Sequence, residues 1–548
     1  MTNLKIIRKI SLYFHTIRYL KFRQIYFRLF YFIYRPLKPK VVQVHFELPK
    51  ALCGFIKSPQ IWVSNNAFCF LNQKRELTFP DGWKNQVSKL WLYNLHYFEF
   101  ILNTSQTQDR QLEIIERWIS DNPYGQGIGW DSYPTSLRII NWVKWNLEHK
   151  KFIKKHLDSL FEQGHHLQRK LEYHLGGNHL FVNGIALLIL GIAVGKKKWE
   201  LQGVQIVKTE VAEQILDDGG HFELSPMYHG LVLRDLLDLL NILIGYGRES
   251  LVDDLKLGHR ICRMLTYYEN LSHPDGEVAF FNDSVSGIAP SFFQLKDYAR
   301  VLGISPLHID TAGKLFKESG YFVYRNSKIN LIVDAGNIGP DYIPGHAHAD
   351  TLSFELSLYG KRLFVNRGIS TYEVNTTRED ERSTASHNTC EIDGVSSSEV
   401  WSSFRVARRA RSESTWLESD SGGRLACSHN GYIRLEYPVE HQREFIISGD
   451  DISILDTFCG QGSHHFAIRF FLHPEVSIVE GARGFKLLSD NRSAEIFFKR
   501  RGIGKLNSQI IPSTFNYQFG HSIVNKGIIV TVSDRVPLTI ETNIQFKG

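Results

Sequence analysis

The period of the hydrophobic pattern changes near residue 318, and this change constrains the fold of the chain most. Before it, apolar residues recur every three to four positions, which is typical of helices. In 136–150 they share one face: Leu137, Ile140, Val143 and Leu147. Segment 178–195 is apolar nearly all round, as expected of a helix buried between others. Segment 225–247 begins with a capping serine followed by proline and predicts a third long helix.

After residue 318 the pattern alternates and turns become frequent. Residues 320–336 predict two strands about an Asn-Ser turn, and 352–368 predict a hairpin about Tyr-Gly-Lys. Later segments continue in the same style to the end of the chain. Helices followed by many strands predict a multidomain α+β chain, with an α domain and then an antiparallel β-sandwich.

Composition and charge set broad limits on function. The chain has 548 residues, of which 43% are hydrophobic and 22% charged, so it is long and apolar enough for two or more folded domains. The net charge of +7 favours an acidic partner. No RNP-like motif, zinc-finger spacing or long basic run in the body of the chain supports a nucleic-acid binder. The cysteines form no CxxC motif and are interpreted as scattered thiols.

The first 35 residues are basic, aromatic and free of acidic residues. They lack the apolar core and cleavage site of a signal peptide, and charges interrupt them too often for a membrane span. Two interpretations remain open. The segment could lie on an anionic membrane as an amphipathic helix, or it could pack on its own protein through its aromatic face.

Two polar clusters stand at the predicted starts of apolar helices. Asn178 and His179 follow two glycines, where free helix amides would favour an anion, although Asn178 could simply cap the helix. Tyr228 falls in the first turn of the helix that begins after Ser225, where the helix dipole favours a phenolate. A buried aromatic residue with a bonded hydroxyl is the alternative.

Two histidine clusters lie in the predicted β region. On a strand, His346, His348 and Asp350 would share a buried face with three apolar residues, Leu352, Phe354 and Leu356. Buried imidazoles need partners, and a metal, a substrate or the fold itself could supply them. His387 and Asn388 begin a later predicted strand, and a third histidine suits a three-ligand metal site.

Two other enzyme classes remain alternatives on this chemistry alone. A cupin-like oxygenase, or another metal-dependent enzyme of the β region, would use the HxH pair with a glutamate and the later histidine. Glu355, however, would lie on the opposite strand face. A glycoside hydrolase would need two positioned carboxylates, for which Asp217, Asp218 and Glu223 are the candidates.

Four motifs taken in order resemble the heparinase II/III family of polysaccharide lyases. They read "GGNHLFVNG", "ELSPMYH", "GHAHADTLSFELSLYGKRLFVNRG" and "RSTASHNTCEIDG". The resemblance spans roughly residues 85 to 420. It implies an N-terminal segment over 1–84, an incomplete α/α toroid over 85–317 and a C-terminal antiparallel β-sandwich over 318–548. It also implies β-elimination on an acidic polysaccharide that contains uronic acid.

The resemblance implies a catalytic role for four of these residues. Asn178 would neutralise the uronate carboxylate, with His179 beside it. Tyr228 would protonate the departing O4 and, for one C5 configuration, also act as the base. His346 would be the complementary base, a role that suits a neutral imidazole. Two further residues of the same helix are candidates for substrate contact: His229 and Arg234.

The resemblance also implies one structural Zn²⁺ in some members of the family. The matching positions here are His348, Asn366 and His387, with Asn366 where a ligating aspartate is expected. Asparagine is a poor zinc ligand because it lacks the charge. Asp350 could replace it; otherwise Asp350 and Asn388 would support the site from behind.

Location and an alternative function complete these expectations. Well-studied members of the family are exported, which implies the bacterial cell envelope or periplasm, whereas the absence of a visible cleavable signal leaves the cytoplasm as the alternative. A non-catalytic protein that binds glycans or assembles surface polysaccharide on the same scaffold is the second functional hypothesis.

Overall fold

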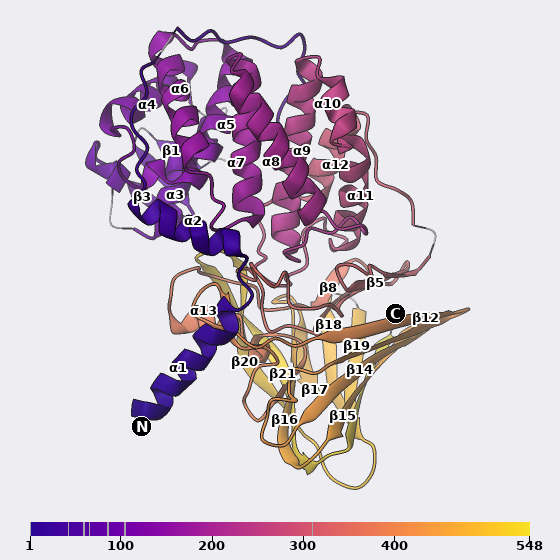
Figure 1. The fold of residues 1–548 in the computed structure, drawn as a ribbon. Helices are drawn as coiled ribbons and strands as arrows, with labels where there is room; N and C mark the ends of the chain where they lie inside the picture. Colours follow the sequence, from indigo (N-terminus) through magenta and orange to yellow (C-terminus); the bar gives the residue numbers. More distant parts are fainter. Residues whose placement is uncertain are drawn as a thin grey trace.

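The computed structural model describes residues 2–41, 43–57, 61–64, 66–84, 87–102, 106–309, 311–490 and 492–547. Two lobes follow one another along the chain (Figure 1). The first is helical and the second is built from antiparallel sheets, so the predicted fold class is confirmed. The last long helix ends at Val301 and the first strand of the β lobe begins at Gly313.

The helical lobe forms where the sequence shows a helical period. Helix α7 packs against both α5 and α8, which explains why its residues from Leu180 to Ala193 are buried all round. The helices of this lobe are α3 (Lys89–Tyr97), α4 (Gln108–Asp121), α5 (Ser132–His149), α6 (Lys154–Arg169), α7 (Gly177–Ala193), α8 (Lys197–Gln214), α9 (Pro226–Gly245), α10 (Glu249–Asp254), α11 (Leu257–Asn270) and α12 (Phe292–Val301).

Two helices and a small sheet precede this lobe. Helix α1 (Thr2–Ile17) lies against the β lobe and α2 (Phe22–Ile33) against the helical lobe (Figure 1). The small sheet consists of β1 (Trp62–Ser64), β2 (Ala67–Phe70) and β3 (Gln73–Glu76). Within the described ranges, the search for a helix with the length and apolar character needed to cross a bilayer found none.

The β lobe contains three larger sheets and a short pair, β10 (Val400–Trp401) with β11 (Arg405–Val406). The five-stranded sheet is β4 (Gly313–Leu315), β5 (Tyr321–Arg325), β6 (Ile329–Asp334), β7 (Phe354–Leu358) and β8 (Lys361–Phe364). The four-stranded sheet, in spatial order, is β20 (Asn507–Gln518), β21 (His521–Arg535), β16 (Ser463–Phe471) and β9 (Cys390–Ile392). The eight-stranded sheet, in spatial order, is β12 (Ser412–Ser419), β13 (Gly422–His429), β14 (Val439–Ser448), β15 (Asp451–Gly460), β22 (Leu538–Lys547), β19 (Arg492–Arg500), β18 (Gly484–Ser489) and β17 (Ser477–Glu480).

The three sheets share one core. The ring of Phe354 on β7 lies 5.6 Å from that of Phe445 on β14 and 6.1 Å from that of Phe470 on β16, measured between centroids. Along β14, buried and half-buried residues alternate, as a sheet with one covered face requires. The predicted hairpins β5–β6 and β7–β8 are both present.

The histidine-rich stretch before β7 differs from its prediction. Strand β7 begins only at Phe354, so His346, His348 and Asp350 lie in the loop between β6 and β7. Leu352 has a φ of 64°, which no strand residue adopts. The loop is held instead by other segments: the Asp283 N–H donates to the His346 carbonyl at 3.0 Å. The alternation of polar and apolar residues in this stretch therefore belongs to an extended, largely buried loop and not to the predicted strand.

Candidate active site

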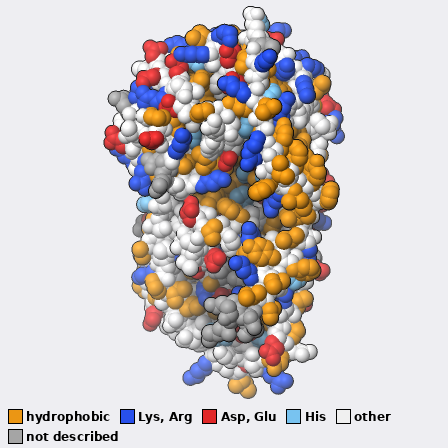
Figure 2. All heavy atoms as spheres, turned by 60° about the vertical axis from the view of Figure 1, so that its left-hand side comes forward, with side chains coloured by type: hydrophobic (Ala, Val, Ile, Leu, Met, Phe, Trp, Pro, Cys, Tyr) orange, Lys and Arg blue, Asp and Glu red, His pale blue; other side chains and the backbone are white. Residues whose placement is uncertain are grey.

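Three predicted residues converge where the two lobes meet. Asn178 is the second residue of α7, Tyr228 lies in the first turn of α9, and His346 comes from the loop before β7. The Tyr228 ring stacks on the His346 imidazole with centroids 3.8 Å apart. Glu223 connects the other pair: its Oε1 accepts from the Asn178 backbone N–H at 3.2 Å, and its Oε2 lies 3.6 Å from His346 Nε2. The space-filling view shows a hollow at this junction (Figure 2).

Local sequence explains how these side chains are presented. Ser225 caps α9 by accepting the backbone N–H of Tyr228, and its hydroxyl donates to the carbonyl of Asp283 at 2.7 Å. Gly177 has a φ of 56°, and a Cβ there would stand 2.7 Å from Glu223 Oε1. Only glycine allows the start of α7 to approach that carboxylate so closely.

Asp283 organises the imidazoles, a role that no sequence motif indicated. Its carboxylate lies 2.9 Å from His346 Nδ1 and 2.8 Å from His348 Nε2. Arg378 donates two further bonds to it, at 2.5 and 2.7 Å. Burial alone would raise the pKa of Asp283, but Arg378 and the two histidines lower it well below its usual range.

The ionised Asp283 fixes the tautomer of His346. Because a carboxylate can only accept, Nδ1 of His346 carries the hydrogen that it donates to Asp283. In the neutral ring, Nε2 then keeps its lone pair. That lone pair is the feature a general base requires, and the 14% exposure of the His346 side chain keeps it accessible.

Tyr228 is a neutral phenol rather than a phenolate. Burial and then the neighbouring Tyr372 raise its pKa well above 10.0, so the expected lowering by the helix dipole does not prevail. Its hydroxyl lies 3.2 Å from that of Tyr372. When the His346 ring is neutral, this junction offers one proton donor, the Tyr228 hydroxyl, and one proton acceptor, Nε2 of the imidazole stacked on the Tyr228 ring.

His179 lies in the same region and is paired with a carboxylate. Its Nδ1 lies 3.1 Å from the carboxylate of Glu172, and its ring packs on that of Tyr133 with centroids 4.3 Å apart. Burial would lower the pKa of His179, but Glu172 outweighs it and the pKa is raised. Glu172 thus favours the protonated form of His179, and the pair as a whole carries no net charge.

The two additional candidates on α9 lie outside this cluster. His229 is buried, with Nδ1 accepting from the His221 backbone N–H and Nε2 bonded to the Met264 carbonyl. Both ring nitrogens are therefore used within the fold, which corrects the expectation that His229 contacts substrate. Arg234 pairs with Glu99 at 2.8 Å and Asp235 at 3.2 Å, so its charge is already balanced.

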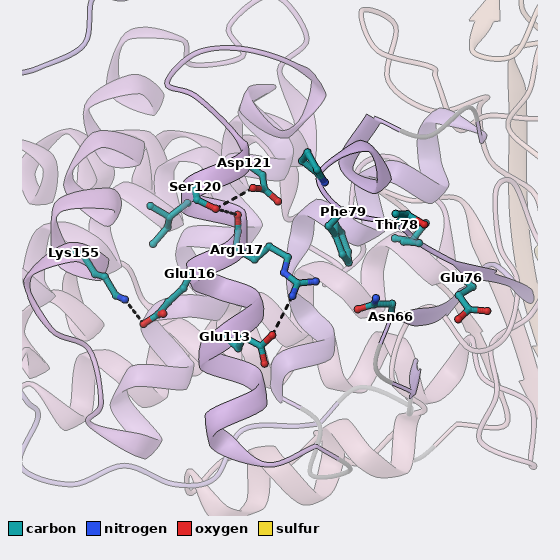
Figure 3. Close-up of a pocket in the computed structure, with 13 residues that line it drawn as sticks. Asn66, Glu76, Thr78, Phe79, Glu113, Glu116, Arg117, Ser120, Asp121 and Lys155 are labelled. Atoms are coloured by element: carbon teal, nitrogen blue, oxygen red, sulfur yellow. Dashed lines mark hydrogen bonds and ion pairs between the residues drawn. The ribbon is translucent and has the colours of Figure 1, made fainter.

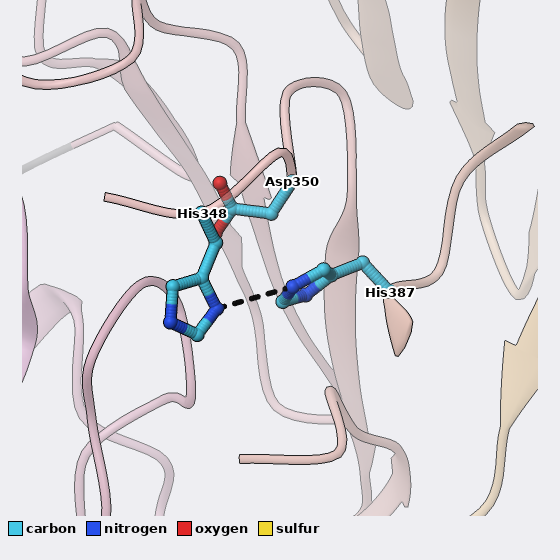
Figure 4. Close-up of side chains that lie close together, drawn as sticks. All are labelled: His348, Asp350 and His387. Carbon is cyan, nitrogen blue, oxygen red and sulfur yellow. Dashed lines mark hydrogen bonds between the residues drawn. The ribbon is translucent and has the colours of Figure 1, made fainter. Parts of the chain in front are cut away.

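Three buried side chains form a candidate metal cluster next to Asp283 (Figure 4). Ligand atoms of His348, Asp350 and His387 all lie within 4.8 Å of one another. His348 Nδ1 and His387 Nε2 are 3.2 Å apart. Two nitrogens bound to one tetrahedral zinc at about 2.0–2.1 Å would be separated by roughly 3.3 Å, so this spacing fits. His387 Nδ1 is buried with no hydrogen-bond partner within the described chain.

The asparagines and Asp350 have other bonds in this cluster. Asn366 Oδ1 accepts the backbone N–H of Asn388, and Asn388 in turn donates to the Phe354 carbonyl. Asp350 accepts from the Asn282 backbone N–H at 2.9 Å, and burial raises its pKa to about 6. The carboxylate that orients the imidazoles is thus Asp283 rather than Asp350, because Asp283 lies between both rings.

A large cavity lies elsewhere and has a different character. It encloses about 920 Å³ between the β3–α4 region and α6, and none of the site residues lines it (Figure 3). Two ion pairs line it, Glu113 with Arg117 at 3.1 Å and Glu116 with Lys155 at 2.5 Å. The junction of the lobes, by contrast, keeps a carboxylate oxygen, Glu223 Oε2, that accepts no hydrogen bond from the described side chains and lies 3.6 Å from His346 Nε2.

Family models match two parts of the chain. The model described as "Heparinase II/III N-terminus" matches residues 141–302, and "Heparinase II/III-like, C-terminal" matches 308–541. Together they contain every residue of the junction cluster.

Individual proteins agree with this match. A heparin-sulfate lyase from Bacteroides stercoris is 30% identical over 244 residues, which cover 40% of this chain and 36% of that protein. One from Pedobacter heparinus is 23% identical over 353 residues, covering 59% and 50%. The chain thus spans half or less of the length of these curated relatives in the matched regions.

Solved structures share the fold. Heparinase III superposes with a TM-score of 0.70 at 19% identity, covering 85% of this chain and 77% of that one. A chondroitin AC lyase from Streptomyces coelicolor A3, in complex with chondroitin sulphate, gives 0.53 at 12% identity, covering 86% and 76%.

Proposed function

Because the chain belongs to the heparinase II/III-like family, we propose that it is a polysaccharide lyase acting on an acidic polymer that contains uronic acid. The observation that carries the proposal is the pairing of a neutral Tyr228 hydroxyl with the Nε2 lone pair of His346 in one hollow. β-Elimination needs these two groups, a base for the C5 proton and an acid for O4.

His346 removes the proton from C5 of the uronate. The C5–H bond breaks, its electron pair forms the C4–C5 double bond, and the C4–O4 bond breaks. The imidazolium that forms lies between two carboxylates, with Asp283 2.9 Å from Nδ1 and Glu223 3.6 Å from Nε2. Both stabilise the positive charge of the protonated base.

Tyr228 donates its hydroxyl proton to the departing O4. Tyr372, 3.2 Å away, can hydrogen-bond the phenolate that remains until it recovers a proton. For a substrate whose C5 proton faces the tyrosine, Tyr228 would also act as the base. No water is consumed, so the product carries an unsaturated uronate.

Asn178 neutralises the substrate carboxylate in this proposal. Its side-chain amide makes no hydrogen bond to any described residue, and it stands in the first turn of α7, where the helix dipole favours negative charge. His179, whose pKa is raised by Glu172, is a second candidate contact for this carboxylate. Neutralising the carboxylate lowers the barrier to forming the enolate-like intermediate.

A structural zinc is part of the proposal. His348, His387 and Asp350 would hold it, with Asn366 outside the ligand set. When bound, the ion would supply a cross-link between the loop before β7 and the start of β9, and no catalytic step passes through it. Metal analysis of purified protein, together with the melting temperature before and after chelation, tests this part separately from activity.

The main experiment incubates the protein with a panel of uronate polymers and follows absorbance near about 232 nm, the band of the unsaturated product. Tyr228→Phe should abolish the signal. Tyr268→Phe is the matched control, because its hydroxyl donates to the Pro290 carbonyl away from the junction. Cleavage without the band would overturn elimination in favour of hydrolysis. Polymer binding with no cleavage would favour the non-catalytic alternative.

A further inference from the structure

The two N-terminal helices expose their apolar faces to solvent. On α1 the exposed residues follow helical spacing: Ile6, Ile10, Phe14 and Ile17. On α2 the corresponding stripe is Phe22, Tyr26, Leu29 and Ile33, with Phe22 81% and Ile33 83% exposed. An apolar surface of this kind is uncommon on a soluble protein and indicates a site of interaction with another protein or with a membrane.

Both helices are held to the protein by polar residues together with a few aromatic rings, such as Phe27 of α2, whose ring lies 4.8 Å from that of Tyr173. Thr16 of α1 donates to the Val406 carbonyl at 3.2 Å. Gln24 of α2 is only 2% exposed and donates to the carbonyls of Leu175 and Tyr342. This orientation reverses the usual one, in which an amphipathic helix buries its apolar face in its own core. The sequence left open whether this segment packs through its aromatic face; the structure turns most of that face outward.

Positive charge surrounds this apolar surface. No acidic residue precedes Glu47, whereas lysine and arginine recur throughout the segment. Arg8, Lys9 and Arg28 are exposed and form no ion pair within the described part of the chain. Arg405, packed on the Tyr13 ring at 5.3 Å, extends the basic surface onto the β lobe. Figure 2 shows exposed hydrophobic side chains gathered with lysine and arginine beside the hollow.

We propose that α1 and α2 dock the protein onto the surface of an anionic lipid bilayer. Apolar side chains on such a helix enter the boundary between headgroups and acyl chains, and flanking cations bind anionic headgroups. A second copy fits poorly, because a symmetric contact would bring two basic surfaces together. An acidic polysaccharide would satisfy the cations but would leave the exposed phenylalanine and isoleucine side chains uncovered.

The docking surface borders both walls of the hollow. Helix α1 packs on Trp401, with the Tyr13 and Trp401 rings 5.0 Å apart, and the nearby Phe404 ring lies 6.0 Å from that of His346. Gln24 of α2 bonds the Leu175 carbonyl, directly before the glycines that lead to Asn178. Docking therefore brings the hollow close to the bilayer.

Vesicle co-sedimentation of the full-length protein tests the proposal. Wild type should pellet with phosphatidylcholine vesicles that contain about 30% phosphatidylglycerol and weakly with pure phosphatidylcholine, and the binding should fall as NaCl rises from about 0.1 to 0.5 M. Replacing Phe22, Leu29 and Ile33 by serine should reduce partitioning at least about tenfold. Arg8→Glu with Lys9→Glu and Arg28→Glu should reduce it roughly a hundredfold or more.

The matched control changes the same residue types on the β lobe. Ile503→Ser with Lys505→Glu alters a site where Ile503 is 97% exposed, and vesicle binding should be unchanged. Sedimentation velocity without vesicles covers the second-copy alternative. A dimer that the serine variant dissociates, with no vesicle binding by wild type, would overturn the proposal, as would equal binding to neutral and anionic vesicles.

Binding to a soluble acidic polymer gives a further discriminating outcome. Retention of wild type by the polymer but not by vesicles, lost in the glutamate variant, would reassign the surface to polysaccharide. Both surface variants leave the junction residues intact, so their elimination activity on soluble polymer should match wild type. A negative lyase assay would leave the vesicle result standing, so the two proposals fail independently.

Discussion

The protein builds a cluster of carboxylate, arginine and imidazole twice, around Asp283 at the junction of the lobes and around Asp456 inside the β lobe. In the second cluster, Arg443 bonds Asp456 at 2.7 and 3.0 Å and His441 Nε2 bonds it at 2.6 Å. His441 Nδ1 lies 3.3 Å from His429 Nε2, and the other His429 nitrogen accepts a backbone N–H. Every imidazole nitrogen in this buried cluster has a partner.

The Asp283 cluster uses the same residue types, but some of its polar atoms have no hydrogen-bond partner. The Nδ1–H of His346 donates to Asp283, and Nε2 faces Glu223, whose Oε2 has no hydrogen-bond partner among described residues. Residue types alone therefore do not identify a reactive site. A spare lone pair in a hollow distinguishes the cluster around Asp283 from a structural one.

The largest expected effect separates the clusters by activity. His346→Ala should lower kcat about 10²–10⁴-fold, because it removes the proposed general base, while the free energy of unfolding falls by only about 1–3 kcal/mol from the lost Asp283 hydrogen bond and Tyr228 stack. The elimination band and urea unfolding measure the two quantities. An active but strongly destabilised variant would make His346 a structural residue like His441.

The reverse result is expected in the β lobe. Asp456→Asn should lower the free energy of unfolding by about 3–5 kcal/mol, because it leaves the fully buried Arg443 without its counter-charge. Activity per folded molecule should be unchanged under conditions where the variant is folded. Asp283→Asn is the matched comparison, and it should lose activity as well as stability. Reduced activity of folded Asp456→Asn would show that the two clusters are coupled.

The dependence of stability on acidic pH should also reveal the contribution of the Asp456 carboxylate. Burial raises the pKa of Asp456, but Arg443 and His441 outweigh it and lower the pKa to about 2. A lowered folded-state pKa contributes stability above the unfolded value of about 3.8, and this stability is lost as pH falls toward 2. The stability lost by wild type between about pH 5 and pH 2 should therefore shrink by about 2 kcal/mol in Asp456→Asn. Urea unfolding at several pH values measures it, and equal losses in the two proteins would show that the Asp456 carboxylate is not their source.

The smallest expected effect concerns the partner of the proton donor. Tyr372→Phe should lower kcat about 2- to 10-fold with KM unchanged, because one neutral hydrogen bond to Tyr228 is lost. Steady-state kinetics on a uronate polymer would measure this. A rise in KM alone would instead make Tyr372 a substrate-binding residue.

The sequence predicted the repeating elements better than the site. Helical and alternating periods located α5, α7, α9 and both early hairpins, because periodicity reports which face is buried. The same reasoning failed at 343–353, where an alternating pattern belongs to a loop held by Asn282, Asp283 and Arg382. Such bonds come from distant segments and impose no period on the sequence.

Within the site, motifs identified Asn178, Tyr228 and His346 but not the residues that tune them. Asp283 stands in a short polar interruption of an apolar run, and Arg378 belongs to the six-residue helix α13 (Thr376–Glu381). Neither position has a pattern of its own. Their importance arises only when the fold brings residues 95 positions apart into contact.

Asp283 also constrains how this family of sites can change over time. One carboxylate contacts the proposed general base His346, the imidazole of His348 and the guanidinium of Arg378, so substitutions of these partners are not independent. The effect of replacing one partner of Asp283 depends on whether the other two remain, so the substitutions are expected to be epistatic. Changes in the cluster around His348 and in the proposed general base are therefore tied to the same side chain, Asp283.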